Sequence, residues 1–413
     1  MSDQTFRKSE AASRKSTGDY VATGGIVASH TLQHLYGQGF YVILPLLYTS
    51  MGLTPIAAGF IGTVRQVSSG IASMLGGFII DRIQHRRVLV LYISLVMMGT
   101  GYFFMALAPT YFLILLALAL AGAAGSIWHP AALSLLSQRY AGRRGFILAI
   151  HRSTGNAGDI LGPLIVGALL QILVWQKIVT GALPLAVAFA LLLFAVLRKA
   201  QGWQKSTDQN TAPRTLREQT GTLKDILRNR ELIVLLLVSG VAGLGQGSIM
   251  LWLPLYLQET QGMGSLGIGL HLGLLSVVGI ATGPLFGILS DRIGRSRIIL
   301  IVLIAKALIA TLMAIVASGT LFTILVGIMG AFIFAVNPLV QAGALDIAEG
   351  RKLEGSMIGL LWGNNALFSG ASPVLVGFLI TSLGYGVLFW YIVAMNTVAA
   401  ILAFILTIIS ANK

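Results

Sequence analysis

Three cationic side chains and one carboxylate lie inside long apolar stretches of this sequence. Arg152 and Asp159 occur in AIHRSTGNAGDILGP at residues 149–163, and Arg65 and Lys306 lie in two other apolar stretches. A charged side chain at the centre of a membrane-spanning helix costs about 2.5–3.5 kcal/mol on insertion scales, so it has to face a partner or a water-filled cavity. These residues therefore mark a candidate functional site.

The spacing of Arg152 and Asp159 is close to two helical turns, so the two side chains belong to one helix face. They lie about 10 Å apart along the helix axis, which is too far for a direct ion pair unless Arg152 extends along the helix. Arg65 is the other candidate partner of Asp159. Two interpretations stay open: an Arg65–Asp159 pair that only tethers helices, or an arginine that faces a cavity and binds an anion.

The balance of charge favours an anion site at Arg65 or Arg152. Three cations oppose one anion in these stretches, and Lys306, near a helix end, is expected to snorkel to the membrane interface. One ion pair therefore leaves a cationic excess. A guanidinium group binds carboxylate, phosphonate or phosphate by two-point contact.

Five of the six histidines also lie in apolar stretches: His30, His34, His129, His151 and His271. His30 and His34 are four residues apart and share a helix face, a spacing that can chelate a metal. The chain has no cysteine and no second carboxylate-rich cluster, so we expect neither a metal nor a cofactor. A histidine that only forms hydrogen bonds inside the fold is the alternative.

Proton transfer is the other chemistry that these residues offer, because histidine titrates near neutral pH. We expect His34, Asp159 and His151 to take part in proton coupling, with His34 as the preferred candidate and Asp159 as its rival. His129 precedes Pro130, and a proline loosens a helix and frees backbone carbonyl groups.

The composition excludes a soluble domain. The 413 residues are 56% hydrophobic and only 10% charged, with a mean hydropathy of +0.84, whereas globular proteins average about 25% charged residues. Twelve apolar stretches are long enough to span a bilayer. They cover residues 21–48, 55–80, 87–108, 111–138, 143–171, 177–197, 231–257, 264–290, 297–317, 320–346, 354–382 and 386–410.

The basic residues set the orientation. Of the 28 lysines and arginines, all but Arg65, Arg152, Lys177 and Lys306 lie on one side if both termini share that side. The positive-inside rule then places both termini in the cytoplasm, and the net charge of +14 indicates topology rather than nucleic-acid binding. We expect a cytoplasmic tail without a signal peptide, two six-helix bundles and a cytoplasmic linker between them, at residues 1–20, 21–197, 198–230 and 231–410.

The two halves repeat each other. GFIIDRIQHRR begins at Gly77 and GILSDRIGRSR at Gly287, an offset that Pro163 and Pro373 also keep, as do Gly167 and Gly377. LPLLY at residues 44–48 recurs as LPLYL at 253–257, and His129-Pro130 corresponds to Asn337-Pro338. Two parallel six-helix repeats are one known transporter architecture.

With these motifs the chain resembles the major facilitator superfamily from about residue 20 to 410. The Asp-Arg loop motif carries the resemblance; its second copy departs at Ser296 and its first at Gln84 and His85. ASHTLQHLY, GAAGSIWHPAALS and GNAGDILGP resemble the fosmidomycin-resistance branch, whose members are efflux proteins thought to exchange protons for drug. In that branch an Asn-Asp pair stands where Gln33 and His34 stand here.

The resemblance implies an all-α membrane protein of twelve transmembrane helices whose central cavity is lined by spans one, four, seven and ten. His30, Gln33, His34, His129, Gln246, Asn337 and Gln341 are the cavity residues that it implies, beside Arg65 and Arg152. It also implies that the two Asp-Arg loops latch the cytoplasmic gate, through Asp81, Arg82, Asp291, Arg292 and Arg295. GDILGPLIVG at residues 158–167 is similar to the antiporter motif of span five.

We therefore expect a proton-coupled secondary-active transporter that acts as a monomer in a bacterial cytoplasmic membrane. It would move a small organic anion or drug by alternating access, with export favoured. The alternatives are an importer of a carboxylate metabolite or a metal-chelating polycarboxylate, a passive channel, and a membrane-embedded enzyme. No nucleophile–base or metal-ligand constellation supports the enzyme.

Overall fold

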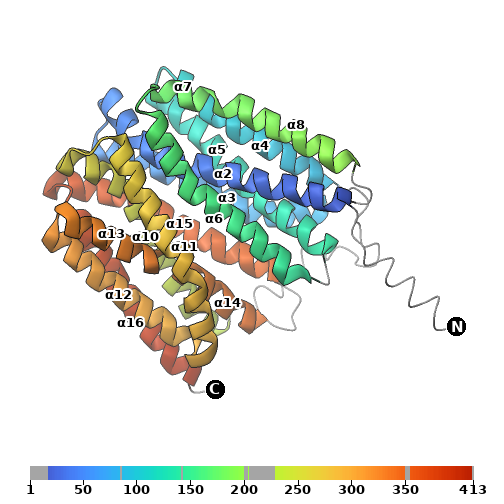
Figure 1. Cartoon of the computed structure of the whole chain (residues 1–413). Helices are drawn as coiled ribbons and strands as arrows, with labels where there is room; N and C mark the ends of the chain where they lie inside the picture. The colour runs from blue at the N-terminus through green and yellow to red at the C-terminus, as the bar shows by residue number, and fades with distance from the viewer. Residues whose placement is uncertain are drawn as a thin grey trace.

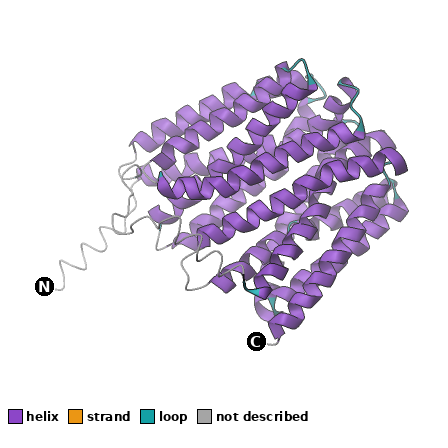
Figure 2. Cartoon of the chain, turned by 180° about the vertical axis from the view of Figure 1, so that it is seen from behind, coloured by secondary structure: helices purple, strands orange, loops and turns teal. Residues whose placement is uncertain are grey.

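The computed structural model describes residues 17–83, 86–140, 143–199, 203, 228–348 and 354–411, and these residues form helices joined by short loops. Figure 1 shows the helices running side by side in one bundle, and Figure 2 shows the same packing from behind. The helices are α2 (Thr17–Ser50), α3 (Pro55–Arg82), α4 (Arg87–Leu107), α5 (Tyr111–Arg139), α6 (Arg144–Leu169), α7 (Trp175–Thr180), α8 (Ala182–Lys199), α10 (Arg230–Gln261), α11 (Ser265–Ile293), α12 (Arg295–Val316), α13 (Gly319–Ile333), α14 (Val336–Ala348), α15 (Glu354–Leu383) and α16 (Val387–Ala411).

Local sequence signals determine where several helices begin and end. Thr54 caps α3 by accepting a hydrogen bond from the Ala57 backbone N–H at 3.2 Å, and Pro55 follows at the first helical position. Both features satisfy or remove the amide groups that a helix start leaves without partners. Helix α10 ends at Gly262, whose φ of +63° is the left-handed conformation that glycine adopts readily.

Within the described residues, nine helical stretches are long and apolar enough to cross a membrane. Two of them join a pair of helices, α7 with α8 and α13 with α14. Helices α2, α3 and α6 lie among the nine but do not meet the same criterion. These three carry the His34, Arg65 and Asp159 side chains, whereas the buried Lys306 lies in α12, the most apolar of the nine stretches.

The two corresponding proline sites have different effects on the backbone. Helix α5 continues through Pro130, so this proline does not break the helix. The chain does break before Pro338, where α13 ends at Ile333 and α14 begins at Val336. Asn337 therefore lies in the first turn of a new helix, beside a backbone break.

The first and second halves of the chain make their most extensive contacts at two helix pairs, α3 with α15 and α6 with α11, and α2 also contacts α10 and α11. Glycines allow both approaches. A Cβ added at Gly377 would lie 2.7 Å from the Pro55 carbonyl oxygen, and one added at Gly167 would lie 2.9 Å from that of Ser265. Glycine thus brings the helix backbones into direct contact, as small residues do in membrane bundles.

The α6–α11 pair is closed at one end and open at the other. Near the end of α6 and the start of α11, a Cβ at Gly269 would overlap the Pro163 carbonyl oxygen. Further along α11, Gly283 and Gly287 have no neighbouring atom within 4 Å of an added Cβ. Helices α6 and α11 are therefore in tight backbone contact at the Gly167 end of α6, and α11 has free space beside it further along.

This difference along α11 predicts opposite effects of the same substitution. Gly269→Ala forces a methyl group against backbone and should cost about 1–3 kcal/mol, as overpacking typically does. Gly283→Ala meets open space and gains helix propensity. We expect thermal unfolding in detergent to give a lower Tm for Gly269→Ala than for wild type and no loss for Gly283→Ala. Equal Tm values would contradict the close backbone contact.

Candidate functional site

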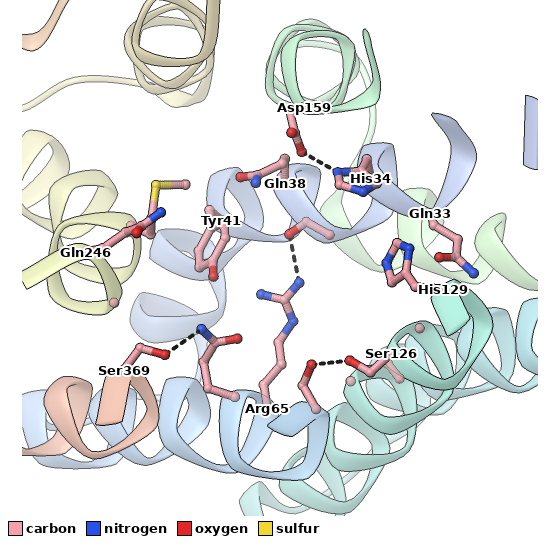
Figure 3. A pocket seen from close by; sticks show the side chains of 18 of the residues that line it. Gln33, His34, Gln38, Tyr41, Arg65, Ser126, His129, Asp159, Gln246 and Ser369 are labelled. Atoms are coloured by element: carbon pink, nitrogen blue, oxygen red, sulfur yellow. Dashed lines mark hydrogen bonds and ion pairs between the residues drawn. The ribbon is translucent and has the colours of Figure 1, made fainter. Parts of the chain in front are cut away.

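A cavity of about 350 Å³ lies between the two halves and is lined by both. Figure 3 shows His34, Arg65, His129 and Asp159 on one part of its wall and Gln246 and Ser369 on another. The first half contributes cationic and titratable side chains. The second half contributes neutral ones, so the two walls differ in chemistry although their helices repeat.

The Arg65 side chain crosses from α3 toward α2. Its Nη2 donates a hydrogen bond to the Gly37 carbonyl oxygen at 3.0 Å, and its Cζ lies 5.0 Å from the Phe40 ring centroid and 5.1 Å from that of Tyr41. Cation–π contacts of this kind stabilise a desolvated guanidinium. Among the described residues, no carboxylate forms an ion pair with Arg65. Arg65 therefore lines the cavity without a carboxylate partner in the described part of the chain.

Asp159 pairs with His34 rather than with Arg65. The Asp159 Oδ1 lies 2.7 Å from the His34 Nδ1, between α6 and α2. The residue is 7% exposed and is the one carboxylate among the described residues that line the cavity. The tethering Arg65–Asp159 pair considered from the sequence is thus not formed. The structure instead leaves Arg65 without a carboxylate partner among the described residues and gives Asp159 an imidazole partner.

His34 also belongs to a cluster of four histidine rings from α2, α5 and α6, which are His30, His34, His129 and His151. The His30 ring stacks on that of His151 with centroids 3.8 Å apart and meets those of His34 and His129 edge-on at 4.5 and 5.1 Å. Trp128 covers the stack at 5.4 Å from His30. His34 and His129 line the cavity, whereas His30 and His151 are buried behind them.

The wall from the second half is a chain of amide groups. Asn337 Nδ2 donates to Gln246 Oε1, and Asn365 Nδ2 donates to Asn337 Oδ1, both at 3.3 Å. Gln66 of α3 reaches across the cavity to Ser369 of α15 at 3.4 Å. These groups offer donors and acceptors without net charge.

Some residues predicted from the sequence lie away from the cavity. Arg152 is exposed and Gln341 is half-buried, and neither lines it. Lys306 does not snorkel as expected, because it lies in the middle of α12 and is only 2% exposed. Its Nζ has no hydrogen-bond partner in the described part of the chain. His271 bonds to Thr323 and to the Gly267 carbonyl, outside the site.

Sequence reasoning also missed part of the wall. Tyr41 and Tyr102 were hidden in apolar runs, whereas Asn365 carried a usable signal: it follows Asn364 within an apolar span. Burying an amide without a hydrogen-bond partner costs free energy, as burying the Arg65 charge does. The same argument therefore applies to Asn365. The missed lining residues with polar side chains are Gln38, Tyr41, Gln66, Ser69, Tyr102, Ser126, Asn365 and Ser369.

The second Asp-Arg loop forms an ion-pair network. Arg295 bonds Asp291 at 3.2 Å and Asp346 at 2.5 Å, which ties the end of α11 and the start of α12 to α14. Arg292 is exposed. The side chains of Asp81 and Arg82, in the first copy, lie outside the described part of the structure, so their predicted gating role stays a prediction.

Sequence comparison relates the chain to membrane transporters. A family model described as the Major Facilitator Superfamily matches residues 26–372. A fosmidomycin resistance protein of Escherichia coli is 25% identical over 293 residues, which are 70% of each chain. A multidrug resistance protein, MdtG, of Citrobacter koseri is 30% identical over 320 residues, covering 74% of this chain and 76% of the relative.

Two solved structures share the fold. The nucleoside transporter NupG superposes with a TM-score of 0.78 at 12% identity, covering 93% of this chain and 99% of that one. A bacterial homolog of the human lysosomal transporter Spinster, in an inward-facing and unoccupied conformation, gives a TM-score of 0.75 at 14% identity, covering 96% of each chain.

Proposed function

The chain belongs to the Major Facilitator Superfamily, and from this premise we propose that it is a proton-coupled secondary-active transporter that exports a small organic anion across a bacterial cytoplasmic membrane. The observation that carries the proposal is the Arg65 guanidinium, which lines a cavity between the two halves and has no carboxylate partner in the described residues. A buried cation without a counter-ion is destabilised, so an anion that binds beside Arg65 gains favourable electrostatic energy.

Cavity geometry supports a small substrate with two kinds of polar group. The volume of about 350 Å³ is at the small end of the range for ligand sites. Arg65 binds the anionic group on one wall, and the amides of Gln246, Asn337 and Asn365 bind hydroxyl, carbonyl or amide groups on the other. A phosphonate or carboxylate with a polar backbone fits both walls. The fosmidomycin resistance relative makes fosmidomycin, a phosphonate, the first probe to try.

Proton coupling is assigned to Asp159. Its carboxylate lines the same cavity as the substrate, so that its protonation state and the substrate's presence influence each other through the local field. His34 holds it from α2, and the other titratable or charged groups around the cavity are Tyr41 of α2, Arg65 of α3, Tyr102 of α4 and His129 of α5.

Alternating access follows from the closed and open ends of the α6–α11 pair. The positive-inside distribution of lysine and arginine assigns the open end to the cytoplasm, so this conformation loads substrate from inside. Rocking of the two halves would then close the Gly283 end and open the Gly269 end. The resistance-type names of the relatives favour export over import.

Removing the Arg65 charge should abolish anion transport. Losing one partner of a buried, hydrogen-bonded charge pair costs about 2–5 kcal/mol, which raises the half-saturating concentration ~30-fold or more. We expect Arg65→Gln proteoliposomes to show this loss for fosmidomycin.

Lys177→Gln, which removes a charge in α7 away from the cavity, should transport normally. Arg152→Gln should lose less than Arg65→Gln, since Arg152 is exposed and outside the cavity. Normal transport by Arg65→Gln would refute the anion site.

Neutralising Asp159 should separate transport from its driving force. Asp159→Asn keeps the shape of the site but cannot release a proton, so accumulation driven by an imposed pH gradient should disappear. Substrate exchange between equal pH values should persist, because Arg65 is unchanged. Measuring both fluxes in the same proteoliposomes tests this. Gradient-driven accumulation by Asp159→Asn would show that another group carries the proton.

A further inference from the structure

The histidine cluster has a second property that transport does not require. One ligand atom from each of His30, His129 and His151 lies within 4.8 Å of the other two. These residues come from α2, α5 and α6, so the sequence shows only the His30–His34 spacing and not this convergence. We propose that the three imidazoles form a binding site for a divalent transition metal of the zinc class, reached from the cavity through His129.

The hydrogen bonds of the cluster leave ring nitrogens available for a metal. His30 Nδ1 lies 2.7 Å from the His151 carbonyl oxygen, which can only accept, so Nδ1 carries the proton and Nε2 keeps its lone pair. A ring N–H bonded to a backbone carbonyl or a carboxylate is the usual second partner of a metal-binding histidine. His34 has the corresponding arrangement through Asp159.

Two buried polar groups beside the cluster have no partner in the described part of the chain. His151 is 4% exposed, and its Nδ1 forms no hydrogen bond. Gln33 is 5% exposed, lines the cavity, and has neither amide atom bonded. A buried donor or acceptor without a partner costs about 1–3 kcal/mol. Metal ligation by His151, and a metal-bound water hydrogen-bonded to Gln33, would satisfy both.

Close helix packing brings the rings together. Gly155 of α6 lies against the His30 ring, and an added Cβ would overlap it. Gly158, one turn further, lies against the α2 backbone at Thr31. The sequence GNAG at residues 155–158 therefore lets α6 approach α2 closely enough for His151 to stack on His30.

Binding requires a small rearrangement. Zinc–nitrogen bonds of about 2.0–2.1 Å in a tetrahedral site hold the ligand atoms roughly 3.4 Å apart, so the rings have to converge. The His30 and His151 rings are within 9° of parallel, and their in-plane lone pairs cannot meet at one ion. The His151 ring must therefore turn, which its unbonded Nδ1 permits.

Charge around the site is mixed. Asp159 bonds to His34, and the His34 ring contacts that of His30, so a carboxylate lies near the three proposed ligands. Its negative charge compensates part of the charge of a divalent ion. Arg152 follows His151 on α6 and adds a positive charge nearby, but it is exposed and can extend away. Three neutral imidazoles with an open fourth position suit zinc or cobalt and not magnesium, which prefers oxygen ligands.

Purified, detergent-solubilised protein with a histidine-free affinity tag tests the proposal. The background carries His85→Gln, so that only the histidines of the described residues remain. Titration with Co²⁺ should give one saturating equivalent and the visible absorption of a four-coordinate site, and Zn²⁺ should displace it while Mg²⁺ should not. No gradient or substrate is involved, so the result is independent of whether the transport proposal holds.

Matched histidine variants locate the site. His129→Gln and His151→Gln should each weaken Co²⁺ binding at least tenfold, whereas His271→Gln, buried in α11 and bonded to Thr323, should bind as the background does. The Co²⁺ spectrum of the background protein is informative even if a cluster variant fails to fold. Absence of a saturable equivalent in the background, or unchanged affinity in folded His129→Gln and His151→Gln, would overturn the proposal.

Discussion

The cost of placing polar groups in a bilayer is the constraint on which this structure depends. A charged side chain inside a membrane helix bundle needs a polar partner or a water-filled cavity, because its burial without either costs free energy. Arg65 meets this requirement with a backbone carbonyl and two aromatic faces, and Asp159 with a histidine. Helices α2, α3 and α6, which carry His34, Arg65 and Asp159, do not meet the hydropathy criterion that the other cavity-lining helices meet.

Glycine makes this arrangement possible because it has no side chain and lets two helices approach until their backbones touch. The α2–α6 approach at Gly155 and Gly158 brings the histidines together, while the α6–α11 approach at Gly167 and Gly269 holds the two halves of the chain in contact. A single helix, α6, thus contributes to the titratable site and to the closed end. In the proposed transport cycle, α6 moves against α11 and carries Asp159 with it, so the carboxylate and the helix contact change together.

Much of the fold was predictable from the sequence because apolar length and glycine–proline spacing are local properties. The helical architecture followed from them, whereas the superfamily came from the resemblance of the Asp-Arg loop motifs, and the family match confirms it. The pairing of side chains was less predictable. The free-energy cost of burying a charge was enough to make Arg65 a candidate for the cavity wall. Whether Asp159 would pair with Arg65 or with His34 depended on the rotation of the helices, which residue spacing within one helix does not determine. Lys306 shows the same limit, since its burial depends on the neighbours of α12.

The internal repeat explains why the two walls of the cavity differ. The offset that relates Pro163 to Pro373 also relates Asp159 to Ser369, and both line the cavity. The paired motifs likewise place His129 and Asn337 at corresponding positions on its wall. Position is thus set by the repeated backbone, whereas charge is present in only one copy. The wall from the first half thus carries the Asp159 carboxylate, and the repeat-related position of the second half carries the Ser369 hydroxyl. In the proposed transport cycle, proton binding acts at the first wall, and the uncharged second wall contacts the substrate.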